Sequence, residues 1–170
     1  MTSTVSTELQ PFVDTIIVPA LAMLPQKMDT PEARVMLLAI ALQESGCTAR
    51  CQVLAGGGRG PARGLWQFER FGGVQGVLTH GMVRPLASKL CFERFRTDGP
   101  SYVWAALERD DVLACVLARL LLWTDVYRLP PIGDDEGAWR LYLRTWRPGK
   151  PRPDDWAENY ARALETVLSC

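Results

Sequence analysis

The feature of this sequence that most constrains its fold is an unbroken run of eight apolar residues, Val35 to Leu42. Thr30 is a suitable N-cap, Pro31 fits the first helical position, and Gly46 is a natural C-terminal stop. Because the run is apolar on every side, it predicts a helix through the middle of a hydrophobic core. A membrane span would need about 20 such residues, so no membrane-spanning helix is expected here.

Glu44 follows this apolar run at the C-terminal end of the predicted helix. Burial disfavours the charged form of a carboxyl, and the negative end of the helix dipole acts in the same direction, so both raise its pKa. A carboxylic acid that is still protonated near neutral pH can protonate the leaving oxygen of a glycoside. Glu44 is therefore the candidate catalytic residue, and the alternative is a solvated side chain just past a core helix.

A second element, Gly64-Leu65-Trp66-Gln67, begins twenty residues after Glu44. Together with the Glu44-Ser45 pair it resembles the soluble lytic transglycosylase and goose-type lysozyme superfamily. In that superfamily a Glu-Ser pair ends a central helix, and a Gly-Leu-Met-Gln stretch lines the sugar groove. The residues to which the resemblance assigns substrate binding are Ser45, Gly64, Leu65, Trp66 (in place of the more usual Met) and Gln67.

The third element of the superfamily is an Ala-Tyr-Asn-Ala-Gly stretch followed by a helix that carries a Tyr, and it is matched only in part. The corresponding region, residues 141–149, contains Tyr142 and Trp146, and the last predicted helix carries Tyr160. Tyr142 and Trp146 are four residues apart, so they share a helix face but differ in depth by about one turn. We expect one of the two to line the cleft and the other to pack in the core. By the same resemblance, Tyr160 is a substrate-binding candidate.

The resemblance implies a mostly α, lysozyme-like fold in which residues 1–170 form a single domain and a buried central helix ends at the catalytic Glu. It implies cleavage of the β-1,4 bond between N-acetylmuramic acid and N-acetylglucosamine, with no metal or other cofactor. Members of this superfamily often occur in bacteriophages, as virion-associated or lysis proteins. The expected partners are therefore glycan strands of peptidoglycan and other phage virion proteins.

The segment between Ser45 and Arg63 contains no Asp or Glu. An inverting lysozyme needs a second carboxylate to activate water, and hydrolytic goose-type lysozymes tend to carry such acids in this segment. A lytic transglycosylase needs one carboxyl only, because the C6 hydroxyl of the same muramoyl unit closes a 1,6-anhydro ring. We therefore predict a lytic transglycosylase with Glu44 as general acid and base. The alternatives are a hydrolytic goose-type lysozyme and a non-catalytic virion protein that keeps the fold.

Glu69 is the nearest acid downstream of this segment. If the chain after Gly64 is helical, Glu69 lies on a different face from Gln67 and is a surface residue. The alternative is that Glu69 is the second acid of a hydrolytic lysozyme. Among the aromatic residues, Trp66 and Trp146 are the candidates for stacking on a sugar ring, with core packing as the alternative.

Composition and charge limit the other classes of function. The chain is 48% apolar and 22% charged, which is ordinary for a soluble globular protein. Its formal net charge of +0 gives no basic field, so no nucleic-acid partner is expected. Residues 1–8 lack the basic and apolar regions of a secretory signal. We therefore expect synthesis in a bacterial cytoplasm, followed by packaging in a virion, release by lysis, or export by another route.

Cysteine and histidine content argues against a metal site. The five cysteines are odd in number and are expected to be reduced, and His80 is the single His.

The loop after the central helix is rich in glycine and carries Arg50, Arg59 and Arg63. These three cations are candidates for meeting lactyl or peptide carboxylates of peptidoglycan, with solvated surface charge as the alternative.

The remaining sequence is predicted to be helical, without a strand of useful length. A small hairpin in the loop of residues 47–63 stays open. The further helices are expected over residues 11–24, 65–79 (interrupted at Gly72-Gly73), 85–95, 101–109, 111–127, 134–146 and 154–168.

Overall fold

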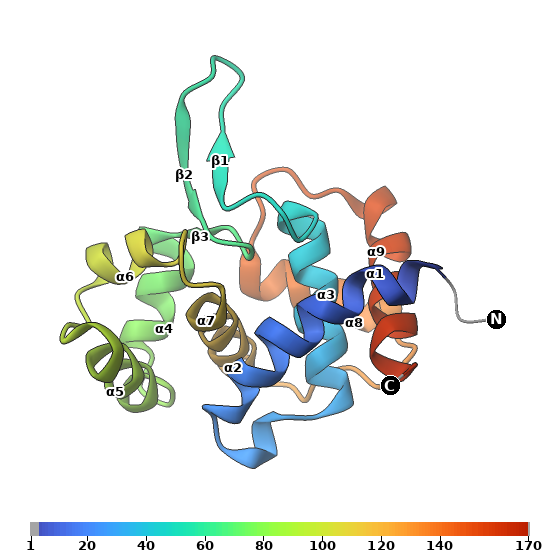
Figure 1. Cartoon of the computed structure of the whole chain (residues 1–170), viewed down its shortest axis with the longest axis horizontal. Helices are drawn as coiled ribbons and strands as arrows, with labels where there is room; N and C mark the ends of the chain where they lie inside the picture. Colours follow the sequence, from blue (N-terminus) through green and yellow to red (C-terminus); the bar gives the residue numbers. More distant parts are fainter. Residues whose placement is uncertain (1–3, 170) are drawn as a thin grey trace.

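The computed structural model describes residues 4–169, which form a mostly helical body and a small antiparallel sheet (Figure 1). The prediction of a mostly α fold is confirmed. The strands are β1 (Cys51–Val53), β2 (Arg59–Arg63) and β3 (Phe68–Glu69). The helices are α1 (Thr4–Phe12), η1 (Val13–Ile17), α2 (Val18–Ala22), η2 (Gln26–Met28), α3 (Pro31–Ser45), η3 (Arg70–Val74), α4 (Gln75–Thr79), α5 (Arg84–Phe95), α6 (Pro100–Ala106), α7 (Asp111–Trp123), α8 (Asp135–Trp146) and α9 (Pro153–Leu168).

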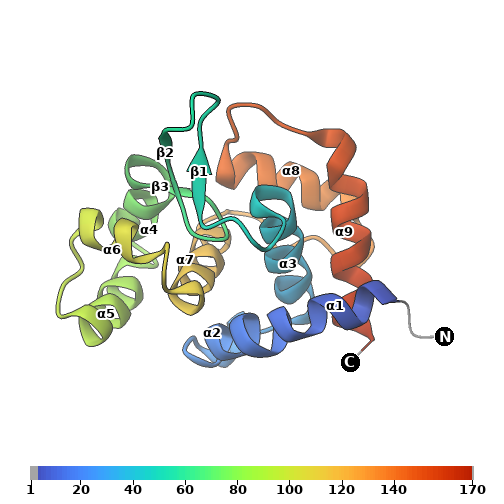
Figure 2. The same ribbon diagram turned by 45° about the horizontal axis from the view of Figure 1, so that its top comes forward.

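Helix α3 lies at the centre of the molecule, as its apolar sequence predicts (Figure 2). The Thr30 side chain accepts a hydrogen bond from the N–H of Ala33 at 3.2 Å, and Gly46 ends the helix with φ of 61°. Between these ends every residue from Val35 to Gln43 is buried. Helices α9, α7 and η1 pack around it. The single helix that could most easily be recognised in the sequence therefore organises the core.

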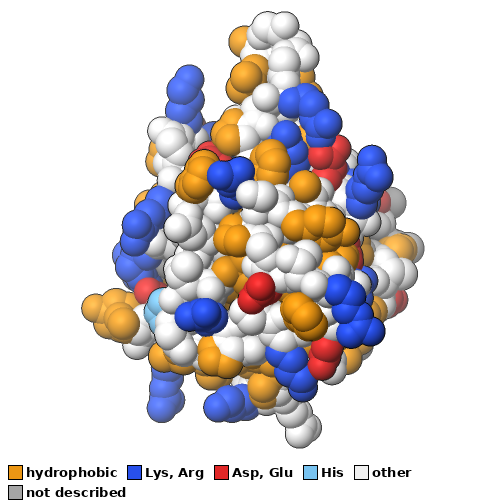
Figure 3. Space-filling model, turned by 90° about the vertical axis from the view of Figure 1, so that its left-hand side faces the viewer, with side chains coloured by type: hydrophobic (Ala, Val, Ile, Leu, Met, Phe, Trp, Pro, Cys, Tyr) orange, Lys and Arg blue, Asp and Glu red, His pale blue; other side chains and the backbone are white. Residues whose placement is uncertain are grey.

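The glycine-rich loop forms the hairpin that the sequence left open. Strands β1 and β2 pair antiparallel, with Cys51 opposite Arg63, and the hairpin rises above the body of the protein (Figures 1 and 3). Its tip carries exposed apolar side chains, including Val53 and Leu54. Strand β3 continues the sheet beyond β2, so that the order is β1-β2-β3.

The prediction of a helix from residue 65 is wrong for the first five residues. Residues 64–67 form a tight turn, and Phe68 and Glu69 pair with β2 before the helical segment begins at Arg70. Two backbone conformations explain the difference, because Gly64 and Gln67 have φ of 76° and 49°. Both values lie in the left-handed region, which a right-handed helix cannot contain.

Helices α4, α5 and α6 lie on one side of α7, and α3, α8 and α9 lie on the other, with the sheet near the junction (Figure 2). The first predicted helix, over residues 11–24, instead begins at Thr4 and runs through α1, η1 and α2 to Ala22. The remaining predicted helices are found with small changes at their ends. Helix α7 ends at Trp123, four residues before the predicted end, and the exposed Val126 and Tyr127 follow it. Within residues 4–169, no helix has the length and apolar character needed to cross a bilayer.

Candidate active site

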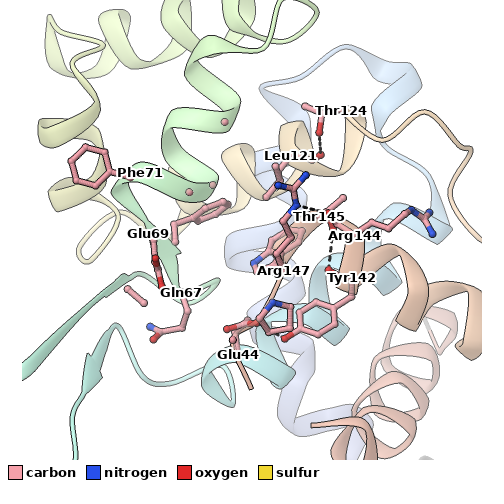
Figure 4. A pocket seen from close by; sticks show the side chains of 18 of the residues that line it. Glu44, Gln67, Glu69, Phe71, Leu121, Thr124, Tyr142, Arg144, Thr145 and Arg147 are labelled. Carbon is pink, nitrogen blue, oxygen red and sulfur yellow. Dashed lines mark hydrogen bonds between the residues drawn. The ribbon is translucent and has the colours of Figure 1, made fainter. Parts of the chain in front are cut away.

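A pocket of about 930 Å³ opens beside the C-terminal end of α3 (Figure 4). Its walls come from the end of α3, the three strands, η3 with α4, the end of α7, and α8 with the loop that follows it. This volume is at the upper end of the usual range for ligand sites. The pocket therefore lies where segments distant in the sequence meet, beside the residue that the sequence identifies as the candidate acid.

Glu44 lies half-buried in this pocket, and its Oε1 accepts a 2.6 Å hydrogen bond from the hydroxyl of Tyr142. Burial is the largest influence on this carboxyl and raises its pKa. The Tyr142 hydrogen bond and the positive charge of Arg152 act in the opposite direction, and the net pKa is still raised. A partly desolvated carboxyl of this kind is suited to donate a proton and to take one back.

Tyr142 and Trp146 both line the pocket, so the prediction that only one of them would do so is wrong. Tyr142 is the deeper residue, at 3% exposure, yet its hydroxyl reaches Glu44. Trp146 is half-buried one turn later, and its indole N–H donates to the backbone oxygen of Trp66 at 3.0 Å. The two residues are four positions apart on one face of α8, and their rings stack with centroids 6.4 Å apart.

The turn of residues 64–67 fixes the position of Gln67. A Cβ atom at Gly64 would lie 2.7 Å from the carbonyl oxygen of Leu107, so only glycine fits there. The N–H of Gln67 and its side-chain amide both donate to the oxygen of Gly64, at 2.9 and 3.0 Å. Gln67 lines the pocket with φ of 49°, a conformation that costs free energy in residues other than glycine and is often found at functional sites.

Leu65 and Trp66 are fully buried, so the prediction that their side chains bind substrate is wrong. The Trp66 ring packs on Phe12 and its N–H donates to the oxygen of Leu37 at 3.0 Å, which places it in the core against α3. Ser45 also has a structural contact, since its hydroxyl lies 2.7 Å from the oxygen of Leu65. Ser45 and Trp66 thus hold the 64–67 turn against the central helix and leave Gln67 facing the pocket.

Tyr160 is buried outside the pocket, so its predicted role in substrate binding is wrong as well. Its hydroxyl accepts a 3.2 Å hydrogen bond from the N–H of Gly133, in the loop before α8. Burial raises the pKa of this Tyr, in keeping with a structural residue. The resemblance assigned Tyr160 a role because it lies in the last helix, but its side chain packs against the loop before α8.

Gln43, which directly precedes Glu44, is a buried supporting residue that the sequence analysis did not identify. It is 1% exposed, and its side-chain N–H donates to the backbone oxygen of Arg152 at 2.9 Å. The Arg152 guanidinium donates in turn to the backbone oxygen of Gln43, and Asn159 donates to the Gln43 side chain at 2.9 Å. These bonds join the residue before Glu44 to the loop between α8 and α9. The only feature of the sequence that could have indicated this role is that Gln43 is a polar residue directly after the apolar run.

Glu69 lines the same pocket as Glu44 and Gln67, so the prediction that it lies on a different helix face from Gln67 is wrong. Glu69 lies on strand β3 and Gln67 ends the turn before it, and both line the pocket from the side of the sheet (Figure 4). Phe71, which is 76% exposed, follows on η3 at the pocket wall. The site therefore has a second carboxyl and an exposed aromatic ring opposite α8.

The three arginines of the glycine-rich hairpin are engaged elsewhere in the protein. Arg50 binds Asp111 at 2.6 Å, while Arg59 and Arg63 both pair with Glu108. None of the three lines the pocket. The prediction that they meet substrate carboxylates is therefore wrong, because these cations fasten the hairpin to the segment around the start of α7.

Neither a protein-family model nor a curated protein matches this sequence, and no solved structure matches the fold.

Proposed function

We propose that this protein has a lysozyme-like fold and is a lytic transglycosylase that cleaves peptidoglycan between N-acetylmuramic acid and N-acetylglucosamine. The observation that carries the proposal is Glu44, a half-buried carboxyl of raised pKa at the wall of a large pocket. The glycosidase chemistry requires such a group, and the resemblance in the Glu44-Ser45 and Gly64-to-Gln67 elements supplies the substrate class.

In the proposed reaction Glu44 donates its proton to the glycosidic oxygen, which leaves as the C4 hydroxyl of N-acetylglucosamine. The C6 hydroxyl of the muramoyl unit then attacks C1, and its proton passes to the Glu44 carboxylate. A 1,6-anhydro ring forms, no water is consumed and the acid is regenerated. Tyr142 holds the carboxyl in place through its 2.6 Å hydrogen bond, and Gln67 offers an amide to the sugar.

One observation favours a second candidate, a hydrolytic lysozyme. Glu69 reaches the pocket from β3 and faces the Glu44 side across it (Figure 4). A second carboxylate can activate water by taking one of its protons, and the remaining hydroxide then attacks the anomeric carbon. In that reaction Glu44 remains the acid and the product carries a reducing end.

The test is digestion of purified sacculi, followed by mass analysis of the released muropeptides. We expect anhydro products, which are lighter than hydrolysed products by one water. Glu44→Gln should abolish release, because the amide cannot deliver a proton and general acid–base groups contribute about 10²–10⁴-fold. Glu93→Gln, on the exposed face of α5, is the matched control and should stay active.

Each other outcome selects a different function. Reducing-end products that disappear in Glu69→Gln would establish the hydrolytic lysozyme. Full activity of Glu44→Gln would exclude Glu44 as the acid. Absence of cleavage by the wild-type protein on sacculi of several chemotypes, together with glycan binding, would leave a non-catalytic virion protein that keeps the fold.

A further inference from the structure

Four cations of α8 and the following loop line the pocket: Arg144, Arg147, Lys150 and Arg152. Two of them are already paired. Arg144 binds both oxygens of Asp125, at 3.2 and 2.8 Å, and Arg152 lies 3.5 Å from Asp155 while it also donates to the backbone of Gln43.

Arg147 and Lys150 differ from these two cations. Both side chains are exposed, and within residues 4–169 neither has a carboxylate partner within 4.0 Å. The Arg147 Nε contacts only the backbone oxygen of Arg144, at 3.3 Å. Two positive charges at the edge of the pocket are thus left for a ligand.

The backbone that carries these two charges is held in a defined place. Arg147 ends α8 with φ of 49° and ψ of 54°, and its N–H donates to the oxygen of Leu143 at 3.2 Å. Pro148 and Pro151 restrict the short loop that follows. The Gln43–Arg152 hydrogen bonds fasten its far end beside Glu44. The loop that carries both charges is therefore held beside the candidate acid.

The charge of the pocket is asymmetric as a result. Its acidic side chains are Glu44, Glu69 and Asp125, and Asp125 is neutralised by Arg144. Glu69 lies on the sheet side and Arg147 on the side of α8 (Figure 4), and Lys150 follows in the loop after α8. An uncharged glycan gains less from Arg147 and Lys150 than a carboxylate does, because a carboxylate adds a second charge to each hydrogen bond.

We propose that Arg147 and Lys150 bind carboxylates of the peptide stems of peptidoglycan, so that the preferred substrate is a glycan whose muramoyl units carry peptides. This inference rests on the proposed function and adds the substrate class to it. It assigns the anion-binding role to the loop between α8 and α9, because the arginines of the hairpin are used in internal ion pairs.

The test measures binding without turnover, in the Glu44→Gln background, by calorimetry. Three ligands are compared: a tetrasaccharide of peptidoglycan with peptide stems, the same glycan without stems (which has free lactyl carboxylates), and uncharged chitotetraose. Arg147→Gln/Lys150→Gln should weaken binding of the peptide-bearing ligand by about ten-fold or more, as expected for lost hydrogen bonds between charged groups. Binding of chitotetraose should not change.

The control variant is Lys89→Gln/Arg109→Gln, which also removes one lysine and one arginine charge, but from exposed positions outside the pocket. It should leave all three affinities unchanged. Affinity for the peptide-bearing ligand should also fall with added salt, and this dependence should be reduced in the Arg147→Gln/Lys150→Gln protein. Melting temperatures of both double variants verify that they are folded.

The failures of the two proposals are distinguishable. If the loop variant weakens chitotetraose equally, or weakens no ligand, the assignment of Arg147 and Lys150 is overturned while glycan binding stands. If the loss is as large for the glycan without stems, the lactyl carboxylate is the ligand and the stem assignment is overturned. If the Glu44→Gln protein binds none of the three ligands, the proposed function itself fails.

Discussion

The hydroxyl of Tyr142 donates a 2.6 Å hydrogen bond to Oε1 of Glu44, although the two residues are 98 positions apart in the chain. This contact joins the end of the central helix to the middle of α8. The Glu44 carboxyl is therefore under two opposing influences: burial raises its pKa, and the tyrosine hydrogen bond lowers it. The balance between them sets the pH range over which Glu44 can act as an acid.

Tyr142→Phe should move the alkaline limb of the pH–activity profile to higher pH. The hydroxyl favours the ionised carboxyl, so its loss raises the pKa of Glu44 further and keeps the acid protonated at higher pH. We also expect a lower kcat, because the carboxyl loses the group that orients it. The measurement is kcat/KM against pH on soluble muropeptide oligomers. A profile displaced to lower pH, or one that keeps its limb at reduced height, would contradict the assigned role.

Glu44→Gln should make the protein more stable at neutral pH while it abolishes activity. The folded-state pKa of Glu44 is raised, so the stability that the wild-type side chain contributes is fully present below its unfolded pKa of about 4.3 and is lost as pH rises through the folded pKa. Glutamine does not titrate and suffers no such loss. The expected gain at pH 7 is about 0.5–2 kcal/mol, the usual size of a stabilising substitution.

Urea unfolding of both proteins between pH 3.5 and 8 provides the measurement, since every other titrating group is common to the two. The difference in unfolding free energy should be smallest at the acid end and grow with pH. A constant difference over the whole range would show that Glu44 has the same pKa in the folded and unfolded chains.

The sequence predicts the central helix and the partial burial of Glu44 well because both depend on local signals. An apolar run with a cap at each end specifies a buried helix wherever the rest of the chain lies, and a carboxyl at its end is desolvated as a consequence. The hairpin arginines and Glu69 could not be placed in this way. Their surroundings depend on strand pairing and on the two left-handed residues at Gly64 and Gln67.

The aromatic residues show a second limit of sequence reasoning. Trp66, Tyr142 and Trp146 are all compatible with either a core or a groove, and only their tertiary contacts decide. The indole N–H of Trp66 donates to the backbone oxygen of Leu37, and the backbone oxygen of Trp66 accepts a hydrogen bond from the indole N–H of Trp146. Such partners come from residues 29 and 80 positions away, which no local pattern encodes.

Trp66→Ala and Trp146→Ala should have different consequences. Trp66 is fully buried, and its removal should cost about 3–5 kcal/mol of stability. Trp146 is half-buried at the pocket, so its removal should cost less stability and should weaken glycan binding. Thermal unfolding and calorimetric titration with chitotetraose measure the two effects. Unchanged glycan affinity in folded Trp146→Ala would show that its ring supports Tyr142 and Phe68 without meeting the sugar.

Gly64→Ala should destabilise the protein strongly and displace Gln67 from the pocket. The new Cβ would need a φ of 76° and would lie 2.7 Å from the Leu107 carbonyl oxygen, a backbone atom that cannot move aside alone. Gly57→Ala is the matched control, because its φ is 80° but nothing lies within 4 Å of the added atom. The control isolates the conformational cost, which is about 1–2 kcal/mol.

We expect Gly64→Ala to exceed the cost of Gly57→Ala by about 1–3 kcal/mol, the size of the strain that an extra carbon causes in a packed site. Its activity, measured below its melting temperature, should also fall, since the turn that positions Gln67 must open to admit the methyl group. Equal stability losses for the two variants would show that Leu107 gives way easily. In that case the position of Gln67 in the pocket would have to be set by Ser45 and Trp66, which hold the turn from the side of α3.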